Sequence, residues 1–481
     1  MKKDYNRDKK KIRRTLGVHL TSQEVFRSYI FPEIKDELYD YLWIDLYCGE
    51  GNLILPILDS IAKAERVDFF RNHIFLSDIQ EKMISRTIEK TKSYGIPFEL
   101  AKKKILLRDN LESFPNNLKD KSFPICHITN PPYLYLGYIR KHDETKRHLK
   151  YFGNDNDGYQ DLYQIAMIND LRNNVEQMVY IIPSNFIFGA SVSNKFRLDL
   201  LKWYQIQKMY IFETQMFEFT GTNICIGFFK RKVTQRAEEQ IFETIKFKKK
   251  NKVLKRTYNL SPNFKYRGGS EFDAFLKKCR AVEPLKVVYY LKNDDVIKNA
   301  GTNKLEVIDT NEYHSNSYER KTLLVNDFLY DKVRSNKLYV RTVDTGSIDG
   351  RVGLNVIKDD FNVDGIYVSK ATYRTSPIQI FLNPKMSHND QILLMKYFNL
   401  ILEYFRKKLD SEFLTTYKYS NAEYTRKYLG LIQVRKLIKT FPMLHINQDD
   451  KKRLIKYIEN EQSSELINLL NYLNRKSKEN L

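Results

Sequence analysis

A series of short apolar runs in the first half of the chain, separated by polar stretches, most constrains the fold. The runs are residues 43–47, 74–78, 105–107, 126–129, 178–182 and 224–229. They are largely continuous rather than alternating with polar residues, which is typical of strands buried on both faces of a sheet. Helical stretches are expected between them, at residues 53–66 and 81–94. This alternation predicts an α/β fold with a mainly parallel sheet.

The second half of the chain has a different pattern. Residues 246–256 (KFKKKNKVLKR) are strongly basic, and the alternation of strands and helices is lost beyond them. Helical periodicity returns near residues 390–408 and 449–475. We therefore predict two domains, residues 1–240 and 241–481, of which the second is an α+β or mainly helical domain.

Several classes of protein are disfavoured by the composition. No apolar run approaches the roughly 20 residues of a membrane-spanning helix, and the basic N-terminal segment lacks the apolar stretch of a signal peptide. The four cysteines are scattered without a C-x-x-C pair, so they predict neither a zinc site nor a disulfide framework. A reducing cytoplasm is the expected location.

The net charge of +22 is unevenly distributed. Lys and Arg exceed Asp and Glu by 6 in residues 1–240 and by 16 in residues 241–481. A basic surface attracts polyanions and releases their counterions on binding, which favours a nucleic-acid partner. A Lys-rich composition without such a partner is the alternative interpretation of the same charge.

Acidic residues and glycines follow three successive predicted strands. The segment Asp45–Gly51 (DLYCGEG) ends the first strand, and Gly49 and Gly51 permit a tight turn with close approach of a ligand. Asp78 ends the second strand, where a carboxylate can bind both hydroxyls of a ribose. Asp109 follows the third, where it can accept from an adenine amino group. Parallel strands place these groups along one edge of the sheet.

The spacing does not favour a phosphate-bearing ligand. A G-x-x-x-x-G-K-[ST] element is missing, and so is the full G-x-G-x-x-G spacing, with Leu55 and Pro56 standing beyond Gly51. A cofactor with an adenosine, a positive centre and no phosphates fits better. S-adenosylmethionine is such a molecule.

Residues Asn130-Pro131-Pro132-Tyr133, after the fourth strand, carry the most specific signal. The two prolines fix the backbone and remove two N–H donors. The side-chain oxygen of Asn130 and the carbonyl of Pro131 can each accept a hydrogen from an NH2 group on a planar ring. The nitrogen lone pair then becomes available for attack on a methyl group, while Tyr133 can stack on the ring.

Residues 15–235 resemble the catalytic domain of the γ-type amino-methyltransferases that make N6-methyladenine in DNA. The resemblance rests on residues 17–22 (GVHLTS), Asp45–Gly51, Asp78, Asp109, Asn130–Tyr133, 181–186 (IIPSNF) and Met216–Phe219, in the family's order. The family usually has Thr-Pro where this chain has Thr21-Ser22.

The resemblance implies a Rossmann-like, S-adenosylmethionine-dependent methyltransferase domain followed by a target-recognition domain. The implied cofactor-binding residues are Thr21, Asp45, Gly49, Gly51, Asp78 and Asp109. The implied catalytic residues are Asn130, Pro131, Pro132 and Tyr133, with Phe217, or alternatively Phe219, stacking on the extruded base. A metal is not implied.

The expected function is site-specific adenine-N6 methylation of double-stranded DNA, which protects host DNA in a restriction-modification system. We expect one copy to act on DNA, and a cognate restriction endonuclease on a separate chain. Extrusion of the adenine requires a second domain that binds the duplex. Candidate groove-contacting residues are 373–375, 417–421, Tyr424, Arg426, Lys427 and Tyr428. The alternatives are the same chemistry on RNA bases or protein glutamine, and a catalytically inactive DNA-binding protein.

Overall fold

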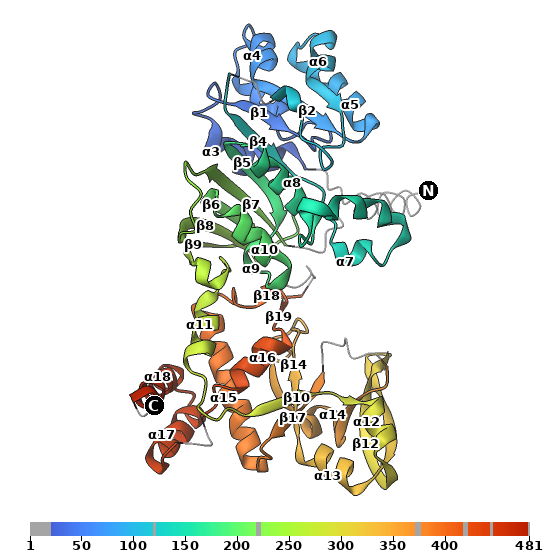
Figure 1. The fold of residues 1–481 in the computed structure, drawn as a ribbon, viewed down its shortest axis with the longest axis vertical. Helices are drawn as coiled ribbons and strands as arrows, with labels where there is room; N and C mark the ends of the chain where they lie inside the picture. The colour runs from blue at the N-terminus through green and yellow to red at the C-terminus, as the bar shows by residue number, and fades with distance from the viewer. Residues whose placement is uncertain are drawn as a thin grey trace. The chain divides into compact units, whose positions relative to one another are not determined.

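The computed structural model describes residues 21–118, 122–217, 223–370, 377–416, 422–442 and 446–479. The chain divides into two compact units, residues 1–268 and 269–481 (Figure 1). Residues 17–20, Phe219, 373–375 and 417–421, which the sequence analysis singled out, lie outside the described residues. Among the described residues, no helix is both long enough and apolar enough to span a bilayer.

The first unit is built on a nine-stranded sheet with the order β3-β2-β1-β4-β5-β7-β6-β8-β9 (Figure 1). The strands are β1 (Leu42–Asp45), β2 (Ile74–Asp78), β3 (Ile105–Leu107), β4 (Ile125–Thr129), β5 (Gln177–Pro183), β6 (Tyr204–Phe212), β7 (Ile224–Arg231), β8 (Gln240–Lys248) and β9 (Lys252–Leu260). β1 to β5 pair in parallel, β7 is antiparallel to β5 and β6, and β8 is parallel to β6. One edge of the sheet therefore collects the carboxyl ends of every strand except β7 and β9.

Strands β1, β2, β4 and β5 are buried on both faces, as their continuous apolar runs predict. The helices are α2 (Gln23–Val25), α3 (Phe31–Ile34), α4 (Arg66–His73), α5 (Glu81–Thr91), α6 (Phe98–Lys104), α7 (Leu136–Ile139), α8 (Leu162–Arg172), α9 (Asn185–Phe188) and α10 (Ser191–Leu200). Met178 and Tyr180 of β5 belong to an apolar cluster with α8 and α10. Val179 and Ile181 belong to a second cluster with α4 and residues 53–61. The alternating residues of β5 thus pack into two separate layers.

Six predicted strands correspond to β1–β5 and β7, but two details differ from expectation. The helix expected over residues 53–66 is a short 3-10 turn, Leu55–Ser60, followed by α4 from Arg66. Pro56 lies in its first turn and supplies no backbone N–H. β6 was not predicted, because the polar residues of its first half alternate with buried ones and so interrupt the apolar run.

The first unit extends beyond residue 240, which was the predicted end of the first domain. β8 continues the sheet by pairing with β6, and β9 pairs with β8 in an antiparallel hairpin. The basic run 246–256 forms much of this hairpin rather than an interdomain linker. The boundary between the units lies at Gly268, because these two strands complete the sheet before the chain leaves it.

The second unit is α+β. Its two larger sheets have the orders β10-β17-β14-β15 and β11-β16-β12-β13, and β18 pairs with β19. The strands are β10 (Lys286–Tyr289), β11 (Leu291–Lys292), β12 (Ala300–His314), β13 (Ser317–Val325), β14 (Leu338–Arg341), β15 (Gly353–Val356), β16 (Gly365–Val368), β17 (Ile378–Asn383), β18 (Thr415–Thr416) and β19 (Lys427–Tyr428). This architecture matches the α+β expectation for the second domain.

The helices of the second unit agree in part with the predicted ones. They are α11 (Ser270–Lys278), α12 (Asn293–Lys298), α13 (Asp327–Ser335), α14 (Ile357–Phe361), α15 (His388–Lys408), α16 (Leu431–Ile438), α17 (Gln448–Glu459) and α18 (Ser463–Glu479). The helix predicted near residues 390–408 is α15. The single helix predicted over residues 449–475 is two helices, because Glu461 adopts a left-handed conformation (φ 52°) between α17 and α18.

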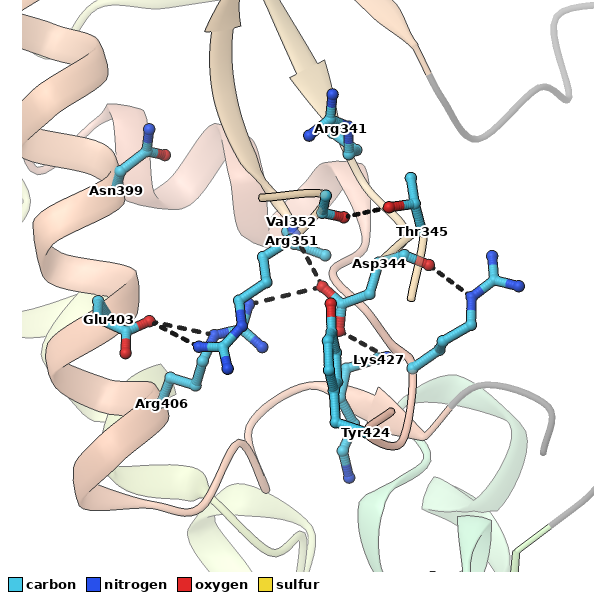
Figure 2. A network of polar contacts seen from close by, with 12 residues as sticks. Arg341, Asp344, Thr345, Arg351, Val352, Asn399, Glu403, Arg406, Tyr424 and Lys427 are labelled. Carbon is cyan, nitrogen blue, oxygen red and sulfur yellow. Dashed lines mark hydrogen bonds and ion pairs between the residues drawn. The ribbon is translucent and has the colours of Figure 1, made fainter. Parts of the chain in front are cut away.

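A buried carboxylate organises the loop between β14 and β15. Asp344 is fully buried, and its side chain accepts hydrogen bonds from the backbone N–H groups of Val352 (2.8 Å) and Lys427 (2.9 Å) (Figure 2). Arg406 Nη2 lies 3.7 Å from the same carboxylate, and Arg426 Nε donates to the Asp344 carbonyl (2.6 Å). The network ties this loop to the segment that carries four of the predicted groove-contacting residues.

Candidate active site

A cavity of about 490 Å³ lies at the edge of the sheet where the carboxyl ends of β1, β2 and β4 meet. Seven of the predicted site residues line it: Thr21, Asp45, Gly49, Asp78, Asp109, Asn130 and Pro132. Residues that the sequence analysis did not single out also line it, among them Tyr47, Asn52, Asn110, Arg147, His148, Lys150 and Tyr151. Gly51, Pro131, Tyr133 and Phe217 are not among the lining residues.

The glycine loop is shaped by two left-handed glycines, Gly49 (φ 51°) and Gly51 (φ 70°). The Gly49 N–H donates to Asp78 Oδ2 (2.8 Å), which holds the loop against the end of β2. A Cβ atom on Gly51 would lie 2.8 Å from Leu55 Cδ1 and 2.9 Å from Thr87 Cγ2. Gly51 therefore permits the loop to pack against α5, whereas Gly49 lines the cavity.

Two buried carboxylates face the cavity. Asp45 Oδ1 accepts from Thr129 Oγ1 (2.6 Å) and from the Tyr47 N–H (3.0 Å), and burial raises the pKa of Asp45 to about 6. Burial also raises the pKa of Asp78, although the N–H groups of Gly49 and Gln80 donate to its carboxylate. Two desolvated carboxylates beside one cavity favour a cationic ligand.

The tetrad and the glycine loop are joined directly. Asn130 Nδ2 donates to Thr21 Oγ1 (2.8 Å), and Asn52 Nδ2 donates to the Thr21 carbonyl (2.8 Å). Thr129, which precedes the tetrad, donates to Asp45 at the start of the glycine loop. The amide of Asn130 and the glycine turn consequently lie on the walls of one cavity, as the predicted chemistry requires.

The aromatic residues of the predicted site pack against the apolar core and do not line the cavity. The Tyr133 hydroxyl donates to the Ile181 carbonyl (2.6 Å) and also contacts Asn130 Oδ1. An amide oxygen has two lone pairs, so Asn130 Oδ1 retains the capacity to accept a second hydrogen. Phe217 is buried in the apolar cluster that contains Ile181, and Tyr133 packs against the same cluster.

The predicted adenine-binding acid, Asp109, already has partners in the chain. It lies two residues beyond β3, and its Oδ2 accepts from the Tyr151 hydroxyl (2.6 Å) and from Lys150 Nζ (3.3 Å). The adjacent Asn110 donates to the Leu46 carbonyl (2.6 Å) and to Ser77 Oγ (3.0 Å). Its buried Oδ1 atom has no hydrogen-bond partner within the described part of the chain. This end of the cavity thus offers an acceptor that the sequence analysis missed, although it directly follows Asp109.

A buried histidine holds the backbone of the glycine loop through a hydrogen bond. His127 Nε2 accepts from the Leu46 N–H (3.1 Å), so the proton resides on Nδ1, which donates to Asp170 Oδ2 (2.6 Å). The Tyr180 hydroxyl also donates to Asp170 (2.7 Å). The sequence analysis did not predict this network, because the three residues lie on β4, α8 and β5 and meet only in the folded chain.

Residues 36–217 match the model of the Eco57I restriction-modification methylase family. This stretch contains the glycine loop, both buried acids and the whole tetrad. The first unit is therefore similar to the methylases of this family over residues 36–217. The match confirms the resemblance to the methyltransferases of restriction-modification systems, and it implies S-adenosylmethionine as the cofactor.

The structure also resembles solved restriction-modification proteins. The type IIL enzyme MmeI, solved in complex with DNA, shares 14% identity over 96% of this chain and 76% of its own, with a TM-score of 0.51, which shows a common fold. A DrdV–DNA complex (15% identity, 48% and 28% covered, TM-score 0.36) and the type IIG endonuclease BpuSI (12%, 95% and 66%, TM-score 0.39) also match. The chain spans less than two thirds of the DrdV and BpuSI chains. A comparison with curated proteins gives no match.

Proposed function

We propose that this chain is a site-specific DNA methyltransferase that transfers the methyl group of S-adenosylmethionine to N6 of an adenine extruded from duplex DNA. The observation that carries the proposal is the pair of hydrogen bonds, Asn130–Thr21 and Thr129–Asp45, that fixes the tetrad beside the glycine loop. An amine-binding corner and a cofactor loop that share one cavity are what direct transfer requires.

The cavity fits the cofactor by the chemistry of its walls. Asp78 at the end of β2 is placed to accept from the ribose hydroxyls, and Asp109 with Asn110 would face the adenine. Asp45 and Thr21, beside the tetrad, would hold the methionine end, where a buried carboxylate stabilises positive charge. When bound, S-adenosylmethionine supplies a methyl group on a positively charged sulfur.

The tetrad would orient the target amine. Asn130 Oδ1 and the Pro131 carbonyl accept the two N6 hydrogens, and the prolines keep this corner rigid. Transfer would form an N–C bond at the expense of the C–S bond of the cofactor, and the nitrogen would then lose one proton to water. Tyr133 and Phe217 would provide the aromatic surfaces for the base, with Pro132 on the wall between base and cofactor.

The family match favours DNA over RNA bases or protein glutamine as the substrate, and an intact tetrad argues against an inactive DNA-binding protein. The second unit, residues 269–481, would bind the duplex and select the sequence. We further propose that a single copy acts on DNA in the cytoplasm. There it would protect host DNA against a cognate restriction endonuclease.

The experiment is transfer of a tritiated methyl group from the cofactor to duplex DNA, with RNA and total protein offered in parallel. We expect DNA alone to be labelled, at adenine N6. Asn130→Ala should lower the rate at least about 100-fold and still bind the cofactor. Asn117→Ala, at an exposed asparagine outside the cavity lining, is the matched control. Wild-type activity in Asn130→Ala, or label in RNA or protein instead, would overturn the proposal.

A further inference from the structure

Positive charge is concentrated at the end of the first unit. Residues 241–268 contain nine Lys and Arg residues but only one acid, Glu243. Residues 269–481 contain 35 Lys and Arg against 27 acids. Half of the basic surplus that the sequence analysis assigned to the second half therefore belongs to the unit that holds the active site.

Much of this charge lies in the turn between β8 and β9, which we call the lysine turn and define as residues 248–252 (KKKNK). Lys248 and Lys252 pair directly across the hairpin, where like charges are destabilising. Lys250 (φ 59°) and Asn251 (φ 54°) are both left-handed. A lysine in that conformation costs roughly 1–2 kcal/mol. The lysines occupy these positions despite these two local costs.

The lysine turn is anchored to the rest of the sheet. Glu213, directly after β6, forms an ion pair with Lys246 of β8 (Nζ–Oε1 3.0 Å), and both side chains are at most 5% exposed. The Glu213 N–H also donates to the Phe247 carbonyl (2.8 Å). This buried pair fixes the base of the turn, on which Lys250 and Lys252 are exposed.

The turn lies at the catalytic edge of the sheet. β8 runs parallel to β6, and both run in the same direction as β4 and β5, so the carboxyl end of β8 is at the edge that carries Asn130. In the strand order, β8 is four positions from β4. With strands about 4.8 Å apart, the lateral distance is roughly 19 Å.

We propose that the lysine turn is a phosphate-contacting element of the catalytic unit, which binds the backbone of the duplex that delivers the target base. This inference rests on the proposed function. Successive phosphates of one strand are about 3.4 Å apart along the helix axis, so roughly 19 Å along that axis corresponds to five or six base pairs from the extruded base. Lysines in a turn supply position and affinity without reading base edges.

The test compares the salt dependence of DNA binding in the full chain. Lys250→Gln/Lys252→Gln removes two charges from the turn. Lys102→Gln/Lys103→Gln removes two exposed charges from α6, which leads into the amino end of β3 and so lies at the opposite edge of the sheet. The probe is a fluorescent duplex of random sequence, and the readout is the slope of log K against log salt.

We expect the turn variant to have a slope shallower by about 1.8, since each phosphate contact contributes about 0.9. The control should keep the wild-type slope, and the turn variant should keep the wild-type rate at saturating DNA. Equal slopes in all three proteins would overturn the inference. In that case the lysines would instead protect the edge strand β9 from pairing with other chains, and the variant would aggregate rather than bind DNA more weakly. Unequal slopes without methyl transfer by the wild type would instead overturn the proposed function.

Discussion

At the scale of single residues, the site depends on polar groups whose partners come from distant parts of the chain. Thr21 accepts from Asn130 and, through its carbonyl, from Asn52, so one threonine links the catalytic amide to the glycine loop. Asp45 plays the matching role through Thr129. Each of these bonds fixes a side chain that would otherwise have several rotamers, so the tetrad and the glycine loop are positioned before any ligand binds.

The raised pKa of Asp45 predicts a pH dependence of cofactor binding. Burial favours its neutral form, so the carboxyl ionises only above about pH 6. A cationic cofactor favours the ionised form, and we expect its affinity to rise up to about tenfold per pH unit below pH 6 and to level off above pH 7. Calorimetric titration between pH 5 and 8 measures this. Asp45→Asn should bind weakly with little pH dependence; a pH-dependent Asp45→Asn would assign the effect to another group.

The same pKa also governs the stability of the chain without cofactor. Because the folded pKa lies above the ordinary value of 3.8, the neutral carboxyl is the form that favours folding. The contribution of neutral Asp45 to the free energy of unfolding is complete below pH 3.8 and is lost as the pH rises to about 6. Cofactor binding should restore stability above that pH by compensating the buried charge.

At the scale of elements, hydrogen bonds from backbone N–H groups clamp the residues that follow the tetrad to the residues that precede α8. The Leu134 N–H donates to Asp161 Oδ1 (2.9 Å), and the Leu136 N–H donates to the Gln160 carbonyl (2.9 Å). Tyr135 and Asp161 form an isolated β-bridge. A strand end supplies the first residue of the tetrad, and a helix start holds the residues after it.

We expect Asp161→Ala to destabilise this clamp. The change leaves the Leu134 N–H without its acceptor, which costs about 1–3 kcal/mol, and methyl transfer should fall with it. Burial raises the pKa of Asp161 to about 7, so its carboxyl is partly neutral at physiological pH. Asp161→Asn retains an oxygen acceptor of similar shape and should be close to wild type. Urea denaturation with parallel methyl-transfer rates compares the two; equal losses in both variants would mean that the charge, not the hydrogen bond, is required.

At the scale of the whole molecule, the division of the chain determines which parts can fold alone. The first unit needs β8 and β9, since β8 covers the edge of β6 and Lys246 neutralises the buried Glu213. The second unit begins at Gly269, which has a left-handed conformation (φ 78°) and directly precedes α11. A cut at the boundary between the units therefore leaves the lysine turn in the same fragment as the candidate active site.

Truncation at two positions tests this division. A chain of residues 1–268 should be monomeric and unfold cooperatively. A chain of residues 1–240 exposes the edge of β6 and lacks Lys246, the ion-pair partner of Glu213. We expect it to aggregate or melt well below the longer fragment. Thermal unfolding and size-exclusion chromatography measure the difference, and equal behaviour of the two fragments would place the boundary at residue 240 after all.

The sequence by itself determined the parallel part of the first sheet and seven of the residues that line the cavity. Strands buried on both faces must be apolar throughout, so β1 to β5 were recognisable as local runs, and parallel pairing then places Asp45, Asp78 and Asn130 at one edge. The tetrad was recognisable because its chemistry is carried by four consecutive residues. Local patterns suffice where a function depends on neighbours in the sequence.

Only the tertiary structure decided the remaining features. The His127–Asp170–Tyr180 network, the role of Asn110 and the clamp at Asp161 join residues that are far apart in sequence. The hairpin of β8 and β9 was assigned to the second domain because its lysines obscure the apolar pattern, although its strands pair with the first sheet through the backbone. Backbone pairing and buried polar contacts depend on which segments meet in the folded chain. No single run of residues in the sequence contains that information.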